Sequence, residues 1–359
     1  MTTTFKTKNS RIAGREALLD TIAGRRPSRQ PVVLFSAGAW TFNSLGLTLE
    51  EVLGDSQSMA STIVRTFEEK APSDAVWVGS GFNNLPVKAL GGAIKYPRKG
   101  TPQVARTVPF SEDRAADRSR IDDLAADPDV RSLWDTTSLV RSAIGDTTLV
   151  GACGWGPFTL AGQTYGPERL LSQVYKDPGA VRRVLDFSVE ASARYYQGFV
   201  EQGAEIISIA EPIASGDMIS RKHFEGFVLP ALSSFLGRLR ESKVYGLLHI
   251  CGNITDRLDL IPDLGVDVLS VDYKVDLRKV REAVGGRIAF AGNVNPADPL
   301  QQGTPEAVIE ASLQCITDAG RESSFILMPG CDIPPSVPLQ NIRAFFEAAE
   351  SHNREVNPP

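Results

Sequence analysis

Short runs of apolar residues alternate with longer segments of mixed polarity along most of the chain. Apolar runs of this length, without polar residues in alternation, are typical of parallel strands that are buried on both faces. The longer segments carry apolar residues at helical spacing, as in helices that cover such a sheet. Eight runs fit the strand pattern, at residues 31–35, 74–78, 148–153, 205–209, 243–250, 268–271, 287–291 and 325–328.

Eight strands separated by helices predict an α/β fold of the closed (β/α)₈ type, the TIM barrel. We expect residues 1–359 to form this barrel as a single domain. The alternative is an open doubly wound sheet, but no Gly-x-Gly-x-x-Gly turn follows the first strand and no Walker-type phosphate loop occurs. In a barrel, the side chains that do chemistry lie at the carboxyl ends of the strands.

Two regions depart from the alternation. Residues 1–30 are predicted to be a polar tail followed by an amphipathic helix over 11–23, an N-terminal extension that caps the bottom of the barrel. Residues 93–145 read as an insertion, with a hairpin over 94–108 and a solvent-facing helix in the Asp- and Arg-rich stretch at 111–129. Further helices are predicted over 49–69, from Pro167 onward and over 305–319.

Composition narrows the class of protein. With 359 residues and 42% apolar content, the chain is long and apolar enough for a large buried core. A net charge of −5, with both signs interspersed, argues against a nucleic-acid partner and against a membrane surface. The first 15 residues are polar and basic and do not resemble a signal peptide, so we expect a cytoplasmic protein whose four cysteines are reduced thiols or metal ligands.

The run from Tyr245 to Asn253 carries the clearest candidate chemistry. His249 and Cys251 are two positions apart, so in a strand they point to the same face and can contact one ion together. Cys331 follows another apolar run, after Pro-Gly. One imidazole and two thiols suit zinc, and three protein ligands leave a fourth position for water or substrate. The pattern predicts a catalytic zinc site formed by His249, Cys251 and Cys331.

A purely structural role is the alternative for these residues. Free cysteines are often buried as small apolar side chains, and a histidine at a strand end is often only hydrogen-bonded. The glycine before Cys331 favours the metal interpretation, because it lets the backbone turn tightly ahead of the thiol.

Six motifs together resemble the uroporphyrinogen decarboxylase superfamily, and within it the zinc-dependent corrinoid methyltransferases of the methylcobalamin:coenzyme M type. The resemblance spans nearly the whole chain and agrees with the predicted barrel. The motifs are Gly-Pro-Phe-Thr-Leu-Ala-Gly at 156–162, Glu-Pro-Ile-Ala-Ser-Gly-Asp at 211–217, His-Ile-Cys-Gly-Asn at 249–253, Gly-Asn-Val-Asn-Pro at 292–296, Gly-Thr-Pro-Glu at 303–306 and Pro-Gly-Cys-Asp-Ile-Pro at 329–334.

The resemblance implies a zinc-dependent methyltransferase that moves a methyl group between a corrinoid, methylcobalamin, and a small thiol, folate or methylated substrate. The family's His-x-Cys pair and later cysteine map onto His249, Cys251 and Cys331, and Asn253 and Asn293, in two of the motifs, are expected to contact the cofactor. No Asp-x-His-x-x-Gly cobalamin signature occurs, so the corrinoid is expected to arrive on a separate partner protein. The direction of transfer and the oligomeric state, for which a dimer is one option, stay open.

Two other functions would also suit a barrel of this superfamily. Decarboxylases of the superfamily hold substrate carboxylates with an arginine after the first strand and pyrrole nitrogens with an aspartate after the second. Residues 36–40 contain no arginine and residues 79–84 no aspartate, so a porphyrinogen would meet no cationic clamp. The second rival is a non-catalytic barrel that binds a corrinoid protein or stores zinc; it would differ in having a closed site with four protein ligands.

Other polar residues near strand ends are weaker candidates. Glu211 is expected to be either a fourth, exchangeable zinc ligand, a hydrogen-bond partner of His249, or simply a helix-capping carboxylate. Asp332 is a further candidate for the group that orients a ligand, and Tyr165 for the pocket lining, with packing as its alternative. The remaining cysteines and histidines, Cys153, Cys315, His223 and His352, are expected to have no role in the site.

Overall fold

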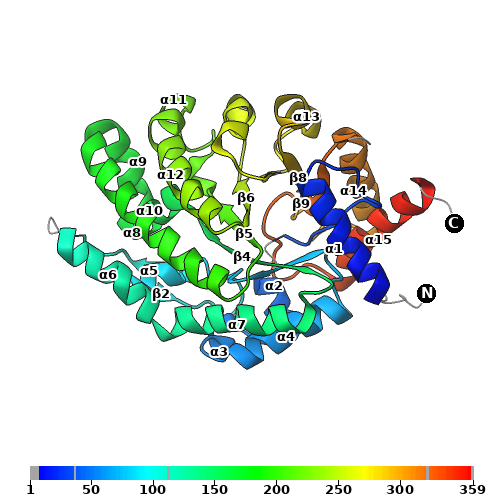
Figure 1. The fold of residues 1–359 in the computed structure, drawn as a ribbon, viewed down its shortest axis with the longest axis horizontal. Coiled ribbons are helices and arrows are strands. Elements are labelled where there is room, and N and C mark those ends of the chain that lie inside the picture. The colour runs from blue at the N-terminus through cyan, green and yellow to red at the C-terminus, as the bar shows by residue number, and fades with distance from the viewer. Residues whose placement is uncertain (1–7, 36–37, 111–113, 321–322, 357–359) are drawn as a thin grey trace.

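The computed structural model describes residues 8–35, 38–110, 114–320 and 323–356. Its centre is a parallel sheet of seven strands in the order β1-β4-β5-β6-β7-β8-β9, curled into a barrel and surrounded by helices (Figure 1). The order follows the chain, as expected for consecutive strand–helix units. The strands are β1 (Ala75–Val78), β4 (Leu149–Trp155), β5 (Ile206–Ala210), β6 (Tyr245–Ile250), β7 (Val268–Val271), β8 (Ala289–Val294) and β9 (Phe325–Pro329).

The expected first strand, at 31–35, fills the gap between β9 and β1 without forming a regular ladder. On one side its peptide groups exchange two hydrogen bonds of 3.0 Å with Leu327 of β9. On the other side the side chains of Ser73 and Asp74 accept its peptide N–H groups at 3.0 and 2.9 Å. Because side chains replace part of the backbone ladder, the segment closes the barrel as an irregular eighth strand. The predicted barrel is therefore confirmed.

The helices cover the outside of the barrel. Proline occupies the first turn of α7, α9, α10 and α14, where its missing N–H costs nothing. The α-helices are α1 (Lys8–Ile22), α2 (Gly38–Asn43), α3 (Leu49–Val52), α4 (Ser56–Glu69), α5 (Leu85–Ala89), α6 (Arg114–Ala126), α7 (Pro128–Ile144), α8 (Pro157–Tyr165), α9 (Pro167–Lys176), α10 (Pro178–Glu201), α11 (Arg221–His223), α12 (Leu229–Glu241), α13 (Leu277–Val284), α14 (Pro305–Ala319) and α15 (Leu339–Val356). Short helical turns are η1 (Pro212–Ala214), η2 (Phe224–Val228), η3 (Thr255–Leu260) and η4 (Pro262–Leu264).

Local differences from the expected elements have local causes. The helix predicted over 49–69 is two helices, α3 and α4, because Gly54 has φ +91° and Asp55 caps α4 by accepting from Ser58 N–H. The insertion contains the expected hairpin, β2 (Ala93–Lys95) paired with β3 (Gln103–Arg106), and the expected helix α6. Residues 111–113 of that prediction lie outside the described residues.

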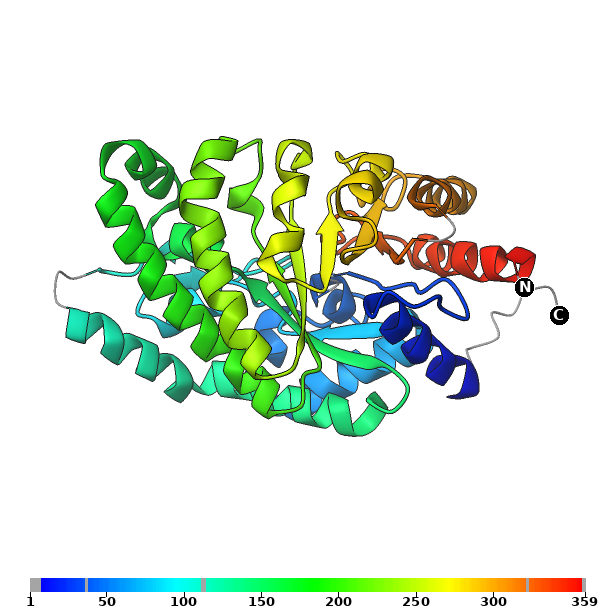
Figure 2. The same cartoon turned by 45° about the horizontal axis from the view of Figure 1, so that its top comes forward.

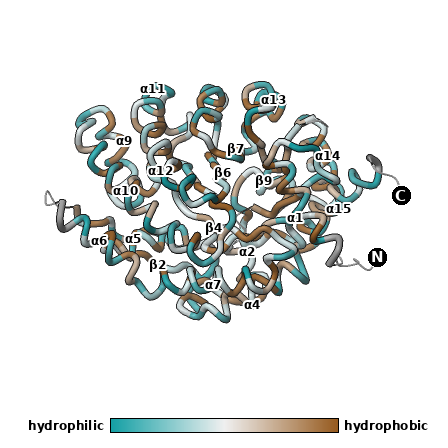
Figure 3. The backbone as a smooth tube through the Cα atoms, in the orientation of Figure 1, coloured by the Kyte–Doolittle hydropathy of each residue, from teal (hydrophilic) through white to brown (hydrophobic). Residues whose placement is uncertain are grey.

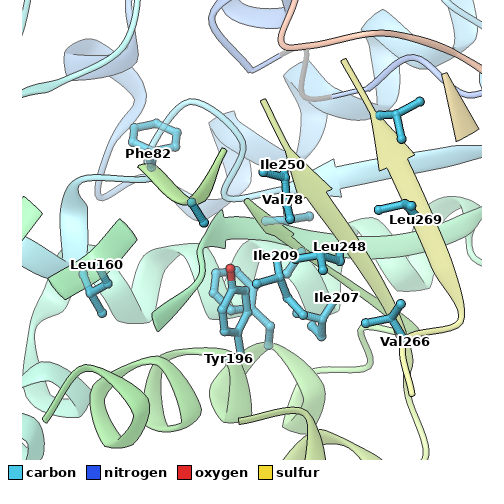
Figure 4. Packing of buried hydrophobic residues seen from close by; sticks show 14 of the residues in the cluster. Val78, Phe82, Leu160, Tyr196, Ile207, Ile209, Leu248, Ile250, Val266 and Leu269 are labelled. Atoms are coloured by element: carbon cyan, nitrogen blue, oxygen red, sulfur yellow. The ribbon is translucent and has the colours of Figure 1, made fainter. Parts of the chain in front are cut away.

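Two apolar clusters form the core. The first fills the barrel and includes Leu18 and Ile22 of α1, so α1 closes the end of the barrel at which the strands begin, as predicted. The second lies between strands and helices; Figure 4 shows Ile207 and Ile209 of β5 beside Tyr196 of α10. Figure 3 shows the apolar character concentrated along the strands, with hydrophilic stretches on the outer helices.

The terminal helices α1 and α15 lie on the same side of the barrel (Figures 1 and 2). Among the described residues, no helix combines the length and apolar character needed to cross a membrane.

Candidate metal centre

Two strand ends bring the candidate metal ligands together. His249 is the last but one residue of β6, and Cys251 is the first residue after that strand. Cys331 comes two residues after the end of β9. Gly252, with φ +87°, turns the backbone directly after Cys251, a conformation that an L-residue adopts only with strain. The carboxyl ends of both strands open on the same face of the barrel, so the three side chains meet there.

The three donor atoms face one another. His249 Nε2 lies 3.1 Å from Cys251 Sγ, and Cys251 Sγ lies 2.7 Å from Cys331 Sγ. All three atoms lie within 4.8 Å of one another, and both cysteines are free thiols. Among the described residues, no other group of three or more His, Cys, Asp or Glu side chains is arranged to hold a metal ion. The structure therefore brings together His249, Cys251 and Cys331, the three residues that the sequence indicated as metal ligands.

The two thiols differ in acidity. The hydrogen bond between the Cys251 and Cys331 thiols lowers the pKa of Cys331, against the opposing effect of burial. For Cys251 the same bond to Cys331, followed by burial, raises the pKa. Both sulfurs must be deprotonated to bind a metal as thiolates, so metal binding at this site should release protons.

Three residues that the sequence analysis overlooked surround the imidazole and the turn. His249 is only 2% exposed; its Nδ1 lies 3.0 Å from Ser270 Oγ, and the ring of Phe35 packs against it at 4.7 Å. Asp272, just after β7, accepts the peptide N–H of Gly252 at 2.9 Å. Two of these residues could have been noticed in the sequence, because Ser270 is a polar residue inside the apolar run at 268–271 and Asp272 directly follows that run.

Glu211 is fully buried at the end of β5, and the structure places it as a helix cap. Its two carboxylate oxygens accept the peptide N–H groups of Phe158, at 2.9 Å, and Thr159, at 2.7 Å, at the start of α8. Burial raises the pKa of Glu211 to about 7, although these hydrogen bonds oppose the shift. The side-chain partner of His249 is Ser270 rather than Glu211. Glu211 is not among the side chains arranged to hold a metal ion, which are His249, Cys251 and Cys331. Of the three expectations for Glu211, capping is the one that these contacts match.

Asp332 and Tyr165 are placed differently. Asp332 adjoins Cys331, and its peptide N–H helps to lower the pKa of that thiol. Tyr165 lies at the end of α8, where the guanidinium of Arg169 stacks on its ring at 4.0 Å and the ring of Phe110 contacts it at 5.7 Å. It lines a groove beside α10 on the outer wall. These contacts match the packing alternative for Tyr165.

The two asparagines expected to contact the cofactor have unequal surroundings. Asn253 is exposed at the rim, and its side-chain oxygen accepts the peptide N–H of Thr255 at 3.0 Å. Asn293 is 9% exposed, and its amide donates to the carbonyl oxygens of Asp272 and Val275 at 3.1 and 2.7 Å. Asn293 therefore holds the turn after β7, and contact with a cofactor stays a prediction for both residues.

The remaining thiols and histidine have surroundings typical of packing. Cys153 is 1% exposed inside the barrel. Cys315 is buried in α14, and burial raises its pKa to about 11. His223 is half-buried and contacts the ring of Tyr175 at 4.4 Å. None of the three is in the group of candidate ligands.

Comparison with known proteins places this fold and site in a family. A model described as uroporphyrinogen decarboxylase (URO-D) matches residues 13–352. The chain belongs to the uroporphyrinogen decarboxylase family. The match covers the barrel from α1 to α15, so family membership rests on the whole fold and not on the metal motif alone.

Relatives within this family carry two kinds of name. The chain is 34% identical over 197 residues to methylcobamide:CoM methyltransferase MtbA of Methanosarcina acetivorans, which spans 55% of the chain and 56% of that protein. It is 31% identical over 225 residues to methylcobamide:CoM methyltransferase MtaA of Methanosarcina barkeri, or 62% of the chain and 64% of that protein. Uroporphyrinogen decarboxylase of Paraburkholderia xenovorans is 26% identical over 305 residues, 80% of each chain. The two methyltransferase matches thus span less than two thirds of those relatives.

Solved structures agree with the family assignment. A structure titled as a methyltransferase from Methanosarcina mazei superposes with a TM-score of 0.84 and 25% identity, covering 94% of this chain and 98% of that one. A B12-independent methionine synthase from Shewanella superposes with a TM-score of 0.56 at 14% identity, covering 86% and 91%, which concerns the fold alone.

Proposed function

We propose that this member of the uroporphyrinogen decarboxylase family is a zinc-dependent methyltransferase. It moves a methyl group between a corrinoid carried by a partner protein and a small thiol, folate or methylated substrate. The observation that carries the proposal is the convergence of His249, Cys251 and Cys331 at the carboxyl end of the barrel, with the donor atoms within 4.8 Å of one another. The named relatives support the corrinoid as the other reactant.

The donor set fits zinc on chemical grounds. Two sulfurs and one imidazole nitrogen are ligands that zinc prefers, and the hydrogen bond from the neighbouring thiol lowers the pKa of Cys331, which favours its thiolate. When bound, zinc would supply Lewis-acid activation of a weak nucleophile such as a thiol. The protein's part is to hold the three donors at the barrel mouth and to orient the imidazole.

The segments that follow the first two predicted strands, residues 36–40 and 79–84, argue against a porphyrinogen as substrate. They pack directly on each other: Gly38 donates its peptide N–H to Ser80 Oγ at 2.9 Å, and a Cβ on Gly38 would lie 2.0 Å from the Ser80 carbonyl oxygen. Residues 36–40 contain no arginine and residues 79–84 no aspartate. These two segments therefore offer no arginine guanidinium to bind the carboxylates of such a substrate.

The test is a pair of assays on the purified chain. We expect about one zinc per chain, and methyl transfer between methylcobalamin and at least one member of a panel of thiols, folates and methoxylated aromatics. Transfer should stop when a chelator removes zinc and resume when zinc is restored. Absorption spectra of the isolated chain should show no corrinoid bands, because the cofactor belongs to the partner.

Three outcomes would contradict the proposal. Chelator-insensitive release of carbon dioxide from uroporphyrinogen would indicate the decarboxylase instead. A stoichiometric cobalt signal in the isolated chain would contradict a separate corrinoid carrier. Zinc binding without transfer to any acceptor, in the presence of a corrinoid protein, would favour a binding barrel.

A further inference from the structure

We propose that β7, which supplies no candidate ligand, positions both ligands that come from β6. Ser270 fixes the imidazole of His249, and Asp272 fixes the turn that follows Cys251. This inference rests on the proposed zinc site and adds two positioning residues to it. Ser270 lies on β7, which is hydrogen-bonded to β6, and Asp272 directly follows that strand.

Ser270 is placed to select the form of His249 that can bind a metal. In the parallel register Ser270 is the partner of His249, and both side chains are buried, at 0% and 2% exposure. Ser270 Oγ lies 3.0 Å from Nδ1, while Nε2 faces Cys251. When the hydroxyl oxygen accepts the proton of Nδ1, the lone pair of Nε2 is left free toward the two sulfurs.

Asp272 acts on the second ligand through the backbone. It is 5% exposed, and its Oδ2 accepts the peptide N–H of Gly252 at 2.9 Å while Oδ1 accepts that of Lys274 at 3.0 Å. The carboxylate thereby joins the turn after β6 to the turn after β7. Because Gly252 directly follows Cys251, this bond limits the directions in which the thiol can point.

The chain offers a matched control for Ser270. Ser208 on β5 is also 0% exposed, and its Oγ has no hydrogen-bond partner among the described residues. In the register it is the partner of Leu247, two positions before His249. Replacing either serine by alanine removes one buried hydroxyl from a parallel strand, but only Ser270→Ala removes a contact with the imidazole.

The experiment measures zinc affinity by competition with a chromogenic chelator in four proteins: wild type, Ser270→Ala, Ser208→Ala and Asp272→Asn. Loss of a group that orients a metal ligand typically weakens affinity about 10- to 100-fold, which is the loss expected for Ser270→Ala. Asp272→Asn should weaken zinc binding by roughly tenfold, because an amide can accept only one of the two N–H groups. Ser208→Ala should keep the wild-type affinity, and thermal unfolding should show that all four proteins are folded.

A second readout reports the imidazole directly in the zinc-free protein. The chain contains only 3 histidines, so ¹⁵N-histidine NMR can resolve the tautomer of His249. Wild type should show the proton on Nδ1, and Ser270→Ala should show a mixture of the two tautomers. A serine that served only for packing would not change this pattern.

The outcomes separate this inference from the proposed function. If wild type binds no zinc, the zinc site itself is wrong and the inference falls with it. If wild type binds zinc but Ser270→Ala has the same affinity and the same tautomer, the positioning role is refuted while the zinc site stands. An equal loss of affinity in Ser208→Ala would also refute it, because the effect would then come from the barrel interior in general.

Discussion

Two regions at the carboxyl end of the barrel use buried polar groups in opposite ways. At the end of β5, both oxygens of Glu211 are taken by peptide N–H groups of α8. At the ends of β6 and β9, the donor atoms of His249, Cys251 and Cys331 face one another instead. Both regions place polar side chains at the carboxyl ends of barrel strands. The difference indicates that a buried polar group is a candidate ligand only where the backbone has not already used its donor atoms.

The largest expected effect comes from removing a sulfur. Cys251→Ala or Cys331→Ala should weaken zinc binding by several kcal/mol, roughly a third of the ~10–16 kcal/mol of a complete structural zinc site. Both side chains are only half-buried at the rim, so the barrel should stay folded. Metal analysis after gel filtration measures the loss. Full zinc occupancy in both variants would contradict the assignment.

Glu211→Ala tests the other region. It should leave two buried peptide N–H groups without acceptors and lower the free energy of unfolding by about 2–5 kcal/mol. Zinc affinity in the folded variant should change little, since Glu211 is outside the group of candidate ligands. Denaturant unfolding and chelator competition measure the two quantities. A loss of zinc affinity as large as that of Cys251→Ala would make Glu211 a ligand after all.

The raised pKa of Glu211 predicts a pH dependence of stability. Because the folded carboxyl has a pKa of about 7, the folded state binds a proton more tightly than the unfolded state does. Stability should therefore fall as pH rises from ~4.5 to ~7 and then level off, by up to about 3 kcal/mol from this group. Glu211→Gln removes the titration, so the difference between wild type and variant should follow this curve. A difference that is constant with pH would contradict the prediction.

Gly252→Ala should disturb the turn after Cys251. The backbone has φ +87°, and a Cβ would lie 2.7 Å from Asp217 Oδ2, so we expect a loss of about 1–2 kcal/mol in stability together with weaker zinc binding. Gly286 is a matched control, with φ +78° and no atom within 4 Å of an added Cβ. Gly286→Ala should show the conformational cost with wild-type zinc affinity. If Gly252→Ala binds zinc as tightly as Gly286→Ala and wild type do, the turn at Gly252 does not position the Cys251 thiol.

The smallest effect is expected for Lys274→Ala. Lys274 and Asp217 form an exposed ion pair of 2.8 Å across the rim, and exposed pairs contribute little. The peptide N–H of Lys274, which Asp272 accepts, is kept in the variant. Zinc affinity and the midpoint of thermal unfolding should stay close to those of wild type. A clear loss of zinc affinity would show that the side chains at the rim, as well as the backbone, hold the site.

The sequence predicted most of the fold because its signals are local. Seven of the eight expected strands are regular strands, and α14 has the expected bounds of 305 and 319. The helix α8 was missed, although Gly156 before Pro157 is a common start of a helix. This omission mattered for the site, since the function of Glu211 depends on the N–H groups that α8 presents to it.

The sequence by itself determined the barrel and half of the site. Apolar runs of strand length set the β-strands, and the two-residue period of a strand places His249 and Cys251 on one face. The sequence also indicated Cys331, but only the tertiary structure decided how closely its sulfur approaches that of Cys251, that Ser270 rather than Glu211 contacts the imidazole, and that Asp272 holds the turn. These contacts depend on barrel closure, strand register and helix placement, which are set by packing between residues far apart in the chain and leave no local pattern.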